Sequence, residues 1–352
     1  MNNNVLDPEM EQPADTGFDF SLIDNPAPNE DFGLLKVRPA NKWIDDAKSR
    51  PAPKMLFDCL WYEGELCILF ADTNVGKSIL AVQIADAISK GTPINGFRLE
   101  SKAQRVLYLD FELSDKQFEA RYSDNFTNHY LFSENFLRVE INPDSDPRDD
   151  MSFEDYLDIS LETAIAETKA KVVIVDNLTY LRQGTETAKD ALPLMKSLKS
   201  LKSKHGLSML VLAHTPKRVL SNPITRNDLQ GSKMLINFCD SAFAIGESYT
   251  DKHLRYIKQI KQRNTEQFYD TQNVIICELS KPDNFLRFGF TGYGKERDHL
   301  RTFDEKERAD LMEQARKMNS DGKSQREIAT QLKISLGSVN NYLKDDTDQQ
   351  HP

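Results

Sequence analysis

Four short and almost continuous apolar runs recur along the middle of the chain, and each predicts a buried β-strand. The runs are Leu66–Ala71, Val106–Phe111, Lys171–Asp176 and Met209–Ala213. Between them, apolar residues repeat at helical spacing, for example over Tyr156–Lys169 and Leu192–Lys204. Strands that are apolar on both faces and alternate with helices are typical of a parallel sheet covered by helices on both sides. The pattern therefore predicts an α/β fold.

From Ser241 onward the pattern changes. Four strand-like runs follow one another without helical segments between them, at Ala242–Ile245, Leu254–Ile260, Val274–Leu279 and Phe285–Phe290. Consecutive strands with short connections favour antiparallel pairing. We therefore expect a mostly parallel central sheet with an antiparallel extension.

The first apolar run leads directly into a candidate phosphate-binding loop. Residues 71–78 match the pattern G-x-x-x-x-G-K-[ST], except that Ala71 replaces the first glycine. A helix is predicted directly afterwards, closed by Gly91 and Pro93. Backbone N–H groups of such a loop and of the first helical turn point at a phosphate, and the helix dipole favours the anion. The predicted nucleotide-binding residues are Ala71, Asp72, Thr73, Asn74, Val75, Gly76, Lys77, Ser78 and Ile79.

Individual residues of this loop have distinct expected roles. Gly76 lets the backbone come close to the phosphates, and Lys77 reaches the β- and γ-phosphates as a point charge. The Ser78 hydroxyl can ligate Mg²⁺. Ala71 must avoid a positive φ or adopt it at modest cost. The loop and its flanking strand and helix predict that the chain binds a nucleoside triphosphate.

Two acidic residues at strand ends complete the expected nucleotide chemistry. Asp176 ends an apolar run, and its carboxylate would reach the magnesium shell through Ser78 or water. Glu112 follows the run that ends at Phe111, where a carboxylate can orient the attacking water or take its proton. Asp110 is the competing base, since strand alternation places it on the same side as Glu112. Either carboxylate could instead cap the helix predicted over Asp115–Tyr122.

Composition and charge indicate a cytoplasmic protein with an acidic leader. The formal net charge is −10, of which −8 falls within residues 1–35. That stretch contains four prolines and lacks Lys and Arg. Such a segment favours disorder, although a partner-binding role is an alternative. No run of 18 or more apolar residues and no signal peptide is present, so no membrane contact is expected. The cysteines Cys59, Cys67, Cys239 and Cys277 lack metal-site spacing and are predicted to be reduced.

The C-terminal region has the pattern of a small helix-turn-helix domain. Helices are predicted over Lys306–Met318, Ser324–Leu332 and Leu336–Leu343, with Ser324 and Glu327 spaced as a capping box. This region resembles the DNA-binding domains of resolvases and response regulators. The last helix would present Ser338, Asn340 and Asn341, together with Ser335 and Lys344, to bases or phosphates. Because the charge of the region is balanced, a role in protein contacts is an alternative.

The order of the motifs over Glu63–Gly294 resembles the RecA-type ATPase core, in the branch of ring-forming replicative helicases and their relatives on plasmids and mobile elements. The motifs are the phosphate loop, the strand with Glu112, the strand that ends at Asp176, and Val211–Thr215 with its polar tip. The resemblance implies a RecA-like P-loop fold, ATP and Mg²⁺ as cofactors, DNA as partner and a homo-hexamer. It also implies that His214 is a polar sensor; a core histidine with satisfied hydrogen bonds is the alternative.

The resemblance extends to the segment Ile260–Asn264, which is similar to a Lys-x-Arg signature of this family. It implies that Lys261 and Arg263 reach the γ-phosphate on a neighbouring subunit, with Arg263 as an arginine finger that stabilises transition-state charge. An exposed basic strand face is the alternative. The family's loops after the third and fourth strands line a central pore and hold single-stranded DNA. Here these loops correspond to residues 181–187 and 216–231, and their candidate phosphate contacts are Lys217, Arg218 and Arg226.

The resulting organisation has five parts. They are a disordered leader (1–35), a segment that enters the core (36–62), a RecA-like ATPase core (63–296), a helix-turn-helix domain (303–344) and a tail (345–352). The expected function is that of an ATP-hydrolysing DNA motor or helicase-type ATPase in the replication or mobilisation of a plasmid or mobile element. Two alternatives are an ATP-controlled DNA-binding regulator that does not unwind DNA and an ATP-switched protein scaffold.

Overall fold

The computed structural model describes residues 30–33, 35–145, 147, 150–178, 188–216, 218–229, 233–303 and 305–344. The chain divides into two compact units, Met1–Ala52 and Pro53–Pro352. The segment predicted to enter the core, residues 36–62, is therefore shared between the two units. The expected leader lies mostly outside the described residues, and so do the tail (345–352), the loop 181–187 and Lys217.

The first unit contains a short hairpin and one helix. Strands β1 (Glu30–Phe32) and β2 (Leu35–Val37) pair antiparallel around Gly33, whose φ of 59° suits the turn. The expected leader therefore ends earlier than residue 35, because its last residues pair in this hairpin. Helix α1 (Ala40–Lys48) buries none of its residues, and the Arg38 guanidinium lies 5.0 Å from the centre of the Trp43 ring.

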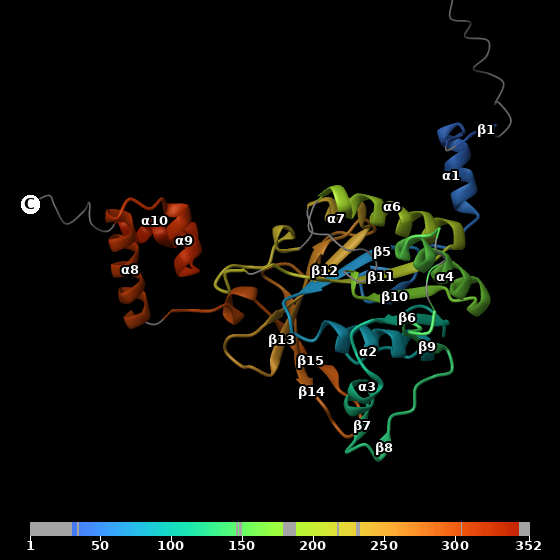
Figure 1. Ribbon diagram of the computed structural model, residues 1–352, viewed down its shortest axis with the longest axis horizontal. Helices are drawn as coiled ribbons and strands as arrows, with labels where there is room; N and C mark the ends of the chain where they lie inside the picture. Colours follow the sequence, from blue (N-terminus) through green and yellow to red (C-terminus); the bar gives the residue numbers. More distant parts are fainter. Residues whose placement is uncertain are drawn as a thin grey trace, which may run out of the picture. The chain divides into compact units, whose positions relative to one another are not determined.

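The second unit is built around a nine-stranded sheet (Figure 1), in the order β15-β14-β13-β12-β5-β11-β10-β6-β9. The six strands from β12 to β9 are parallel, and β13, β14 and β15 add antiparallel. The fold is thus the expected RecA-like α/β sheet with an antiparallel extension. The strand bounds are β5 Leu66–Ala71, β6 Val106–Asp110, β9 Phe136–Val139, β10 Val172–Asp176, β11 Ser208–His214, β12 Ser241–Glu247, β13 Leu254–Lys261, β14 Val274–Ser280 and β15 Arg287–Gly294.

Two details of the sheet differ from the sequence expectation. Strand β12 pairs parallel with β5, with Ala244 opposite Phe70, so the antiparallel part begins only at β13. A helix, α7 (Lys233–Phe238), precedes β12 and allows this parallel crossover. Strand β9 was not predicted; it is a short edge strand whose four residues are only half-buried.

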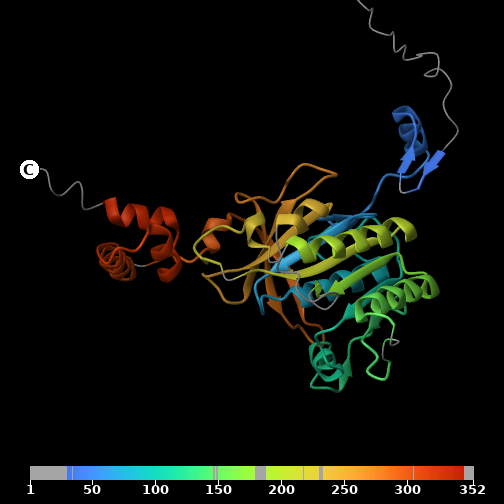
Figure 2. The same ribbon diagram turned by 45° about the horizontal axis from the view of Figure 1, so that its top comes forward.

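Helices cover both faces of the sheet (Figure 2). Helix α2 (Lys77–Lys90) packs on one face, and α4 (Phe153–Thr168) and α6 (Ala188–His205) pack on the other. Successive residues of the central strands point to opposite faces, so Cys67 and Leu69 meet α2 whereas Ile68 and Phe70 meet α6 and its neighbours. Each fully buried Leu, Ile, Val or Phe contributes about 1.5–3 kcal/mol. The two apolar layers fix the strand ends, where the polar residues lie.

Smaller elements close the α2 side of the core. Strands β3 (Met55–Phe57) and β4 (Trp61–Tyr62) form a hairpin whose Trp61 is fully buried. The remaining short elements are α3 Asp115–Arg121, β7 Ser123–Asp124, β8 Asn128–His129, η2 Arg226–Asp228 and η3 Glu296–His299. The four cysteines are buried and free, as expected. Within the described part of the chain, no helix is both long and apolar enough to cross a bilayer.

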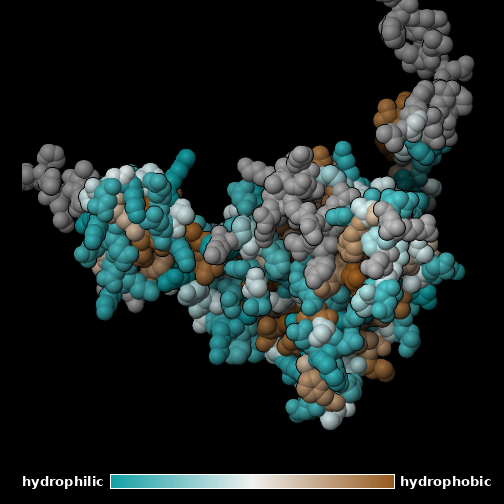
Figure 3. All heavy atoms as spheres, viewed as in Figure 1, coloured by the Kyte–Doolittle hydropathy of each residue, from teal (hydrophilic) through white to brown (hydrophobic). Residues whose placement is uncertain are grey.

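Three helices form the C-terminal region, α8 (Glu305–Ser320), α9 (Gln325–Leu332) and α10 (Leu336–Lys344). They have an apolar core of their own, with Ala315, Ile328, Ile334, Val339 and Tyr342 buried. The predicted capping box is present: Ser324 Oγ accepts from the Glu327 N–H, and Glu327 Oε2 accepts from the Ser324 N–H at 2.8 Å. The surface of these helices is mostly hydrophilic in Figure 3.

Candidate active site

The phosphate loop connects the end of β5 to the start of α2. Its left-handed residues are Asn74 and Gly76, with φ of 63° and 111°. Ala71 is instead the last residue of the extended strand β5, buried and paired with His214. This position therefore does not need the glycine of the usual pattern. A Cβ on Gly76 would approach the Phe288 ring to 3.0 Å, so this second glycine is required by both its backbone conformation and its packing.

Lys77 lies at the mouth of the loop. Its Nζ donates to the carbonyl oxygens of Ala71 and Asp72, both at 3.0 Å, and to His214 Nδ1 at 3.2 Å. The side chain is buried, and this burial lowers the pKa of Lys77 although neighbouring carboxylates oppose the shift. A buried ammonium at the phosphate loop has the charge that the outer phosphates of a nucleotide require.

Asp176 ends β10 beside Ser78 and is almost fully buried. Its Oδ2 accepts from the Tyr108 hydroxyl at 2.7 Å, whereas its buried Oδ1 has no hydrogen-bond partner within the described residues. Burial raises the pKa of Asp176 to about 6, even though the hydroxyls of Ser78 and Tyr108 favour the charged form. An orphaned carboxylate oxygen next to a serine hydroxyl at the phosphate loop fits a divalent cation.

The donor set also indicates which cation fits. No cluster of three or more His, Cys, Asp or Glu side chains that could hold a metal occurs in the described ranges. Mg²⁺ usually takes one or two protein ligands and completes its shell with phosphates and water. Ser78 and Asp176 fit this requirement, and the Mg²⁺ site stays a prediction.

Four polar side chains from four adjacent parallel strands lie in one row across the carboxyl edge of the sheet. In sheet order they are Lys77 after β5, His214 at the end of β11, Asn177 after β10 and Glu112 after β6. Asn177 Nδ2 donates to Glu112 Oε1 and lies 3.2 Å from His214 Nε2. His214 Nε2 is 3.7 Å from Glu112 Oε1. Hydrogen bonding to His214 is the largest factor that lowers the pKa of Glu112, so its carboxylate is charged near neutral pH.

The geometry favours Glu112 over Asp110 as the base. Asp110 is buried, pairs with Arg138 at 2.9 Å through Oδ2, and accepts the Leu113 N–H at 3.0 Å through Oδ1. Both of its oxygens are therefore used within the fold. Glu112 does not cap the following helix either, because the N-cap of α3 is Ser114. The sequence could not exclude Asp110, because Arg138 comes from the unpredicted strand β9.

Lys261 and Arg263 lie at the opposite, amino edge of the sheet. Lys261 pairs with Ala242 at the start of β12, and its Nζ donates to the carbonyls of Ile236 and Cys239 at 2.6 and 2.8 Å. Arg263 forms an ion pair with Asp240 at 3.1 Å. Since β5 spans six residues between the two edges, these cations are separated from the phosphate loop of the same chain by about 20 Å. The structure does not bring them into the site.

The candidate DNA-contacting residues lie elsewhere. Arg226 is exposed at the start of η2, and Arg218 is half-buried with Nη2 donating to the Asn222 carbonyl at 2.9 Å. In the C-terminal region, Ser335 caps α10, because its Oγ accepts the Ser338 N–H at 2.9 Å, and the Ser335 and Ser338 hydroxyls are 2.8 Å apart. Asn341 is exposed and Asn340 half-buried. None of these side chains belongs to the row at the phosphate loop.

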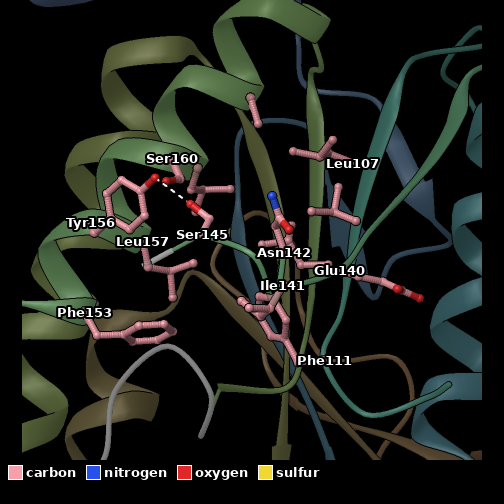
Figure 4. Close-up of a pocket in the computed structure, with 14 residues that line it drawn as sticks. Leu107, Phe111, Glu140, Ile141, Asn142, Ser145, Phe153, Tyr156, Leu157 and Ser160 are labelled. Carbon is pink, nitrogen blue, oxygen red and sulfur yellow. Dashed lines mark hydrogen bonds between the residues drawn. The ribbon is translucent and has the colours of Figure 1, made fainter. Parts of the chain in front are cut away.

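The chain also contains an apolar cavity of about 170 Å³ between α4 and the strands β6 and β9 (Figure 4). Leu107, Phe111 and Leu157 contribute to its walls, and the hydroxyls of Ser145 and Tyr156 are 2.8 Å apart at its rim. No phosphate-loop residue lines it. The cavity is therefore separate from the nucleotide site.

The sheet order, the phosphate loop and the acidic strand ends together define a RecA-like P-loop ATPase. A family model described as AAA domain matches residues 35–219, just over half of the 352 residues. The chain belongs to this AAA domain family.

Two further comparisons concern curated proteins and solved structures. No curated protein matches its sequence. Among solved structures, the chain is similar to the crystal structure of a KaiC-like protein from the hyperthermophilic archaeon Pyrococcus horikoshii OT3, with 14% identity and a TM-score of 0.41. The similarity covers 65% of this chain and 90% of that one.

Proposed function

We propose that this protein is an ATP-driven DNA motor that hydrolyses ATP at interfaces between copies of itself in a ring. The observation that carries the proposal is the division of catalytic groups between the two edges of one sheet. Lys77, Asp176 and Glu112 lie at the carboxyl edge, whereas Arg263 lies a full strand length away. A ring that places the amino edge of one copy against the carboxyl edge of the next would complete each site.

In the proposed reaction, a water molecule attacks the γ-phosphorus and the bond to the leaving ADP oxygen breaks. Glu112 accepts the proton of that water, and Lys77 holds the β- and γ-phosphates. Mg²⁺ bound through Ser78 and Asp176 would neutralise phosphate charge. Arg263 of a neighbouring copy would stabilise the charge that develops on the transferring group, the usual part of an arginine finger.

The proposed DNA partner rests on two separate features. Arg218 and Arg226 lie on the connection that follows β11, and β11 ends at His214. DNA phosphates bound by these arginines would therefore contact the same connection that leaves the ATP site. The C-terminal helices α9 and α10 are joined by a short turn at Lys333–Ser335, the arrangement of a helix-turn-helix. We assign single-stranded DNA to the first feature and duplex DNA to the second. A plasmid or mobile element would supply such a substrate during replication or mobilisation.

One observation favours a second candidate, an ATP-controlled regulator or scaffold without unwinding activity. Helix α10 carries Lys344 as its only charged residue. DNA affinity depends strongly on neutralising phosphates with Lys and Arg, so this helix would bind duplex DNA weakly or would contact protein.

The decisive experiment measures ATP turnover alone, with single-stranded DNA and with duplex DNA, beside the oligomer size with and without ATP. The motor predicts turnover stimulated by single-stranded DNA, an ATP-dependent ring and displacement of a paired strand. DNA stimulation without strand displacement would identify the regulator. An ATP turnover rate that does not change when DNA is added would identify the scaffold.

A further inference from the structure

Asn177 is the one member of the row at the phosphate loop for which the sequence suggested no role. It follows Asp176 directly and is 2% exposed. Asn177 and Glu112 come from neighbouring strands that are held in register, because Asp176 pairs with Asp110 and the Phe111 N–H donates to the Asp176 carbonyl at 3.0 Å. The Asn177 amide is therefore fixed directly beside the Glu112 carboxylate.

The protonation of the His214 ring shows that the Asn177 amide donates to Glu112 rather than to His214. A lysine ammonium can only donate, so the contact between Lys77 Nζ and His214 Nδ1 makes Nδ1 an acceptor and places the ring proton on Nε2. Nε2 then cannot accept from Asn177, and its N–H faces Glu112 Oε1 at 3.7 Å. Asn177 Nδ2 donates to the same oxygen. The Asn177 amide thus holds Oε1, which leaves the second oxygen of Glu112 to receive a proton.

We infer that Asn177 is a positioning residue for ATP hydrolysis, which holds Glu112 by one carboxylate oxygen so that the other faces the attacking water. This inference rests on the proposed function, because it requires Glu112 to be the base. The choice of residue fits the task. Asparagine donates without charge, whereas an aspartate at this position would repel Glu112 and a serine would not reach it. Asn177 is almost fully buried, and its removal would leave Glu112 Oε1 without this donor.

The test is a double-mutant cycle of Asn177→Ala and Glu112→Gln, with kcat and KM for ATP measured in the full-length protein. Asn177→Ala should lower kcat by about 10- to 100-fold while KM changes less than about threefold, because misplacing a catalytic group by about 1 Å has this cost. In the Glu112→Gln background the same substitution should change kcat by less than about twofold, since residues that act as a unit are not additive.

Asn135→Ala is the matched control. Its Nδ2 donates to the Ser89 carbonyl at 3.2 Å, away from the row of polar side chains, so its loss should leave kcat unchanged. Equal losses from Asn177→Ala in both backgrounds would show a purely structural role and overturn the inference. Wild-type kcat in Asn177→Ala, with a large loss in Glu112→Gln, would overturn the inference while leaving Glu112 as the base. Wild-type turnover in Glu112→Gln would overturn the assignment of the base itself.

Discussion

The two edges of the central sheet differ in how their charged groups are satisfied. Within the described part of the chain, Asp176 at the carboxyl edge has a buried oxygen without a partner, and the Lys77 ammonium bonds to two loop carbonyls and His214. At the amino edge, Asp240 accepts the Leu66 N–H and pairs with Lys202 and Arg263, at 2.9 to 3.1 Å. The charged groups of the carboxyl edge can therefore accept a ligand, whereas those of the amino edge are already satisfied by contacts within the same chain.

This difference has a consequence for assembly. The proposed nucleotide-binding groups of the carboxyl edge all come from one chain, so we expect nucleotide binding to need no neighbour. The cations of the amino edge must leave Asp240 and the carbonyls that end α7 before they can contact a phosphate. Nucleotide binding and turnover should therefore separate in this protein, since the proposed binding groups lie at one edge and the proposed arginine finger at the other.

The largest effect is expected at the carboxyl edge, from Lys77→Ala. This substitution should abolish turnover and weaken ATP binding by at least about tenfold, because it removes the only described cation at the loop mouth. Equilibrium titration with a fluorescent ATP analogue and a phosphate-release assay measure the two quantities. Lys90→Ala is the matched control at the other end of α2, where Lys90 pairs with Asp86 and Tyr130. Turnover in the control should stay within about twofold.

The next largest effect is expected at the amino edge. Arg263→Ala should lower turnover by about 10³-fold, the lower end of the range for an arginine finger, while ATP affinity changes little. Wild-type turnover per chain should also rise with protein concentration, because each site needs a neighbour.

Mixing two inactive variants tests whether Arg263 acts on a neighbour. Arg263→Ala keeps Glu112, and Glu112→Gln keeps Arg263, so a mixed ring contains interfaces with both groups intact. Turnover should therefore recover partly on mixing. No recovery, together with a fully active wild-type monomer, would contradict the ring.

The sequence predicted the carboxyl edge better than the amino edge, for a physical reason. The phosphate loop and its strand are local features, in which a continuous apolar run, one glycine and one lysine suffice. The pairing of β12 with β5 depends on the crossover through α7, and the edge strand β9 has too little apolar character to be found. Asn177 was missed because its role comes from a neighbour on an adjacent strand, 65 residues away along the chain. Only the register between β6 and β10 reveals that contact.

The two edges should also differ in the sign of their pH-dependent stability. The pKa of Asp176 is about 6 in the folded protein against 3.8 for an ordinary aspartate. The folded state therefore binds more protons between these values, and this stabilising contribution is present below 3.8 and lost as the pH rises through 6. Asp176→Asn should stabilise the nucleotide-free protein at pH 8 by up to about 3 kcal/mol, and by less at pH 5. Urea unfolding at both pH values measures this difference.

Asp240→Asn is the counterpart at the amino edge and should have the opposite effect. Although burial alone would raise it, the Leu66 N–H and Lys202 lower the pKa of Asp240 in the folded protein. Its stabilising contribution is therefore present above the ordinary pKa and lost as the pH falls through the lowered value. Asp240→Asn should destabilise the protein at pH 8. A stabilising result there would contradict the comparison of the two edges.

The smallest effect on turnover is expected from removing residues 303–352. Both edges of the sheet and both of its apolar layers lie before this segment, and helices α8, α9 and α10 have a separate core. Turnover without DNA should stay within about twofold of the full chain. Duplex DNA affinity, measured by fluorescence anisotropy over a range of salt concentrations, should fall, and the salt dependence should become less steep as phosphate contacts are lost. Unchanged affinity and unchanged salt dependence would show that the three helices contact protein, and the DNA partner would then belong to the sheet alone.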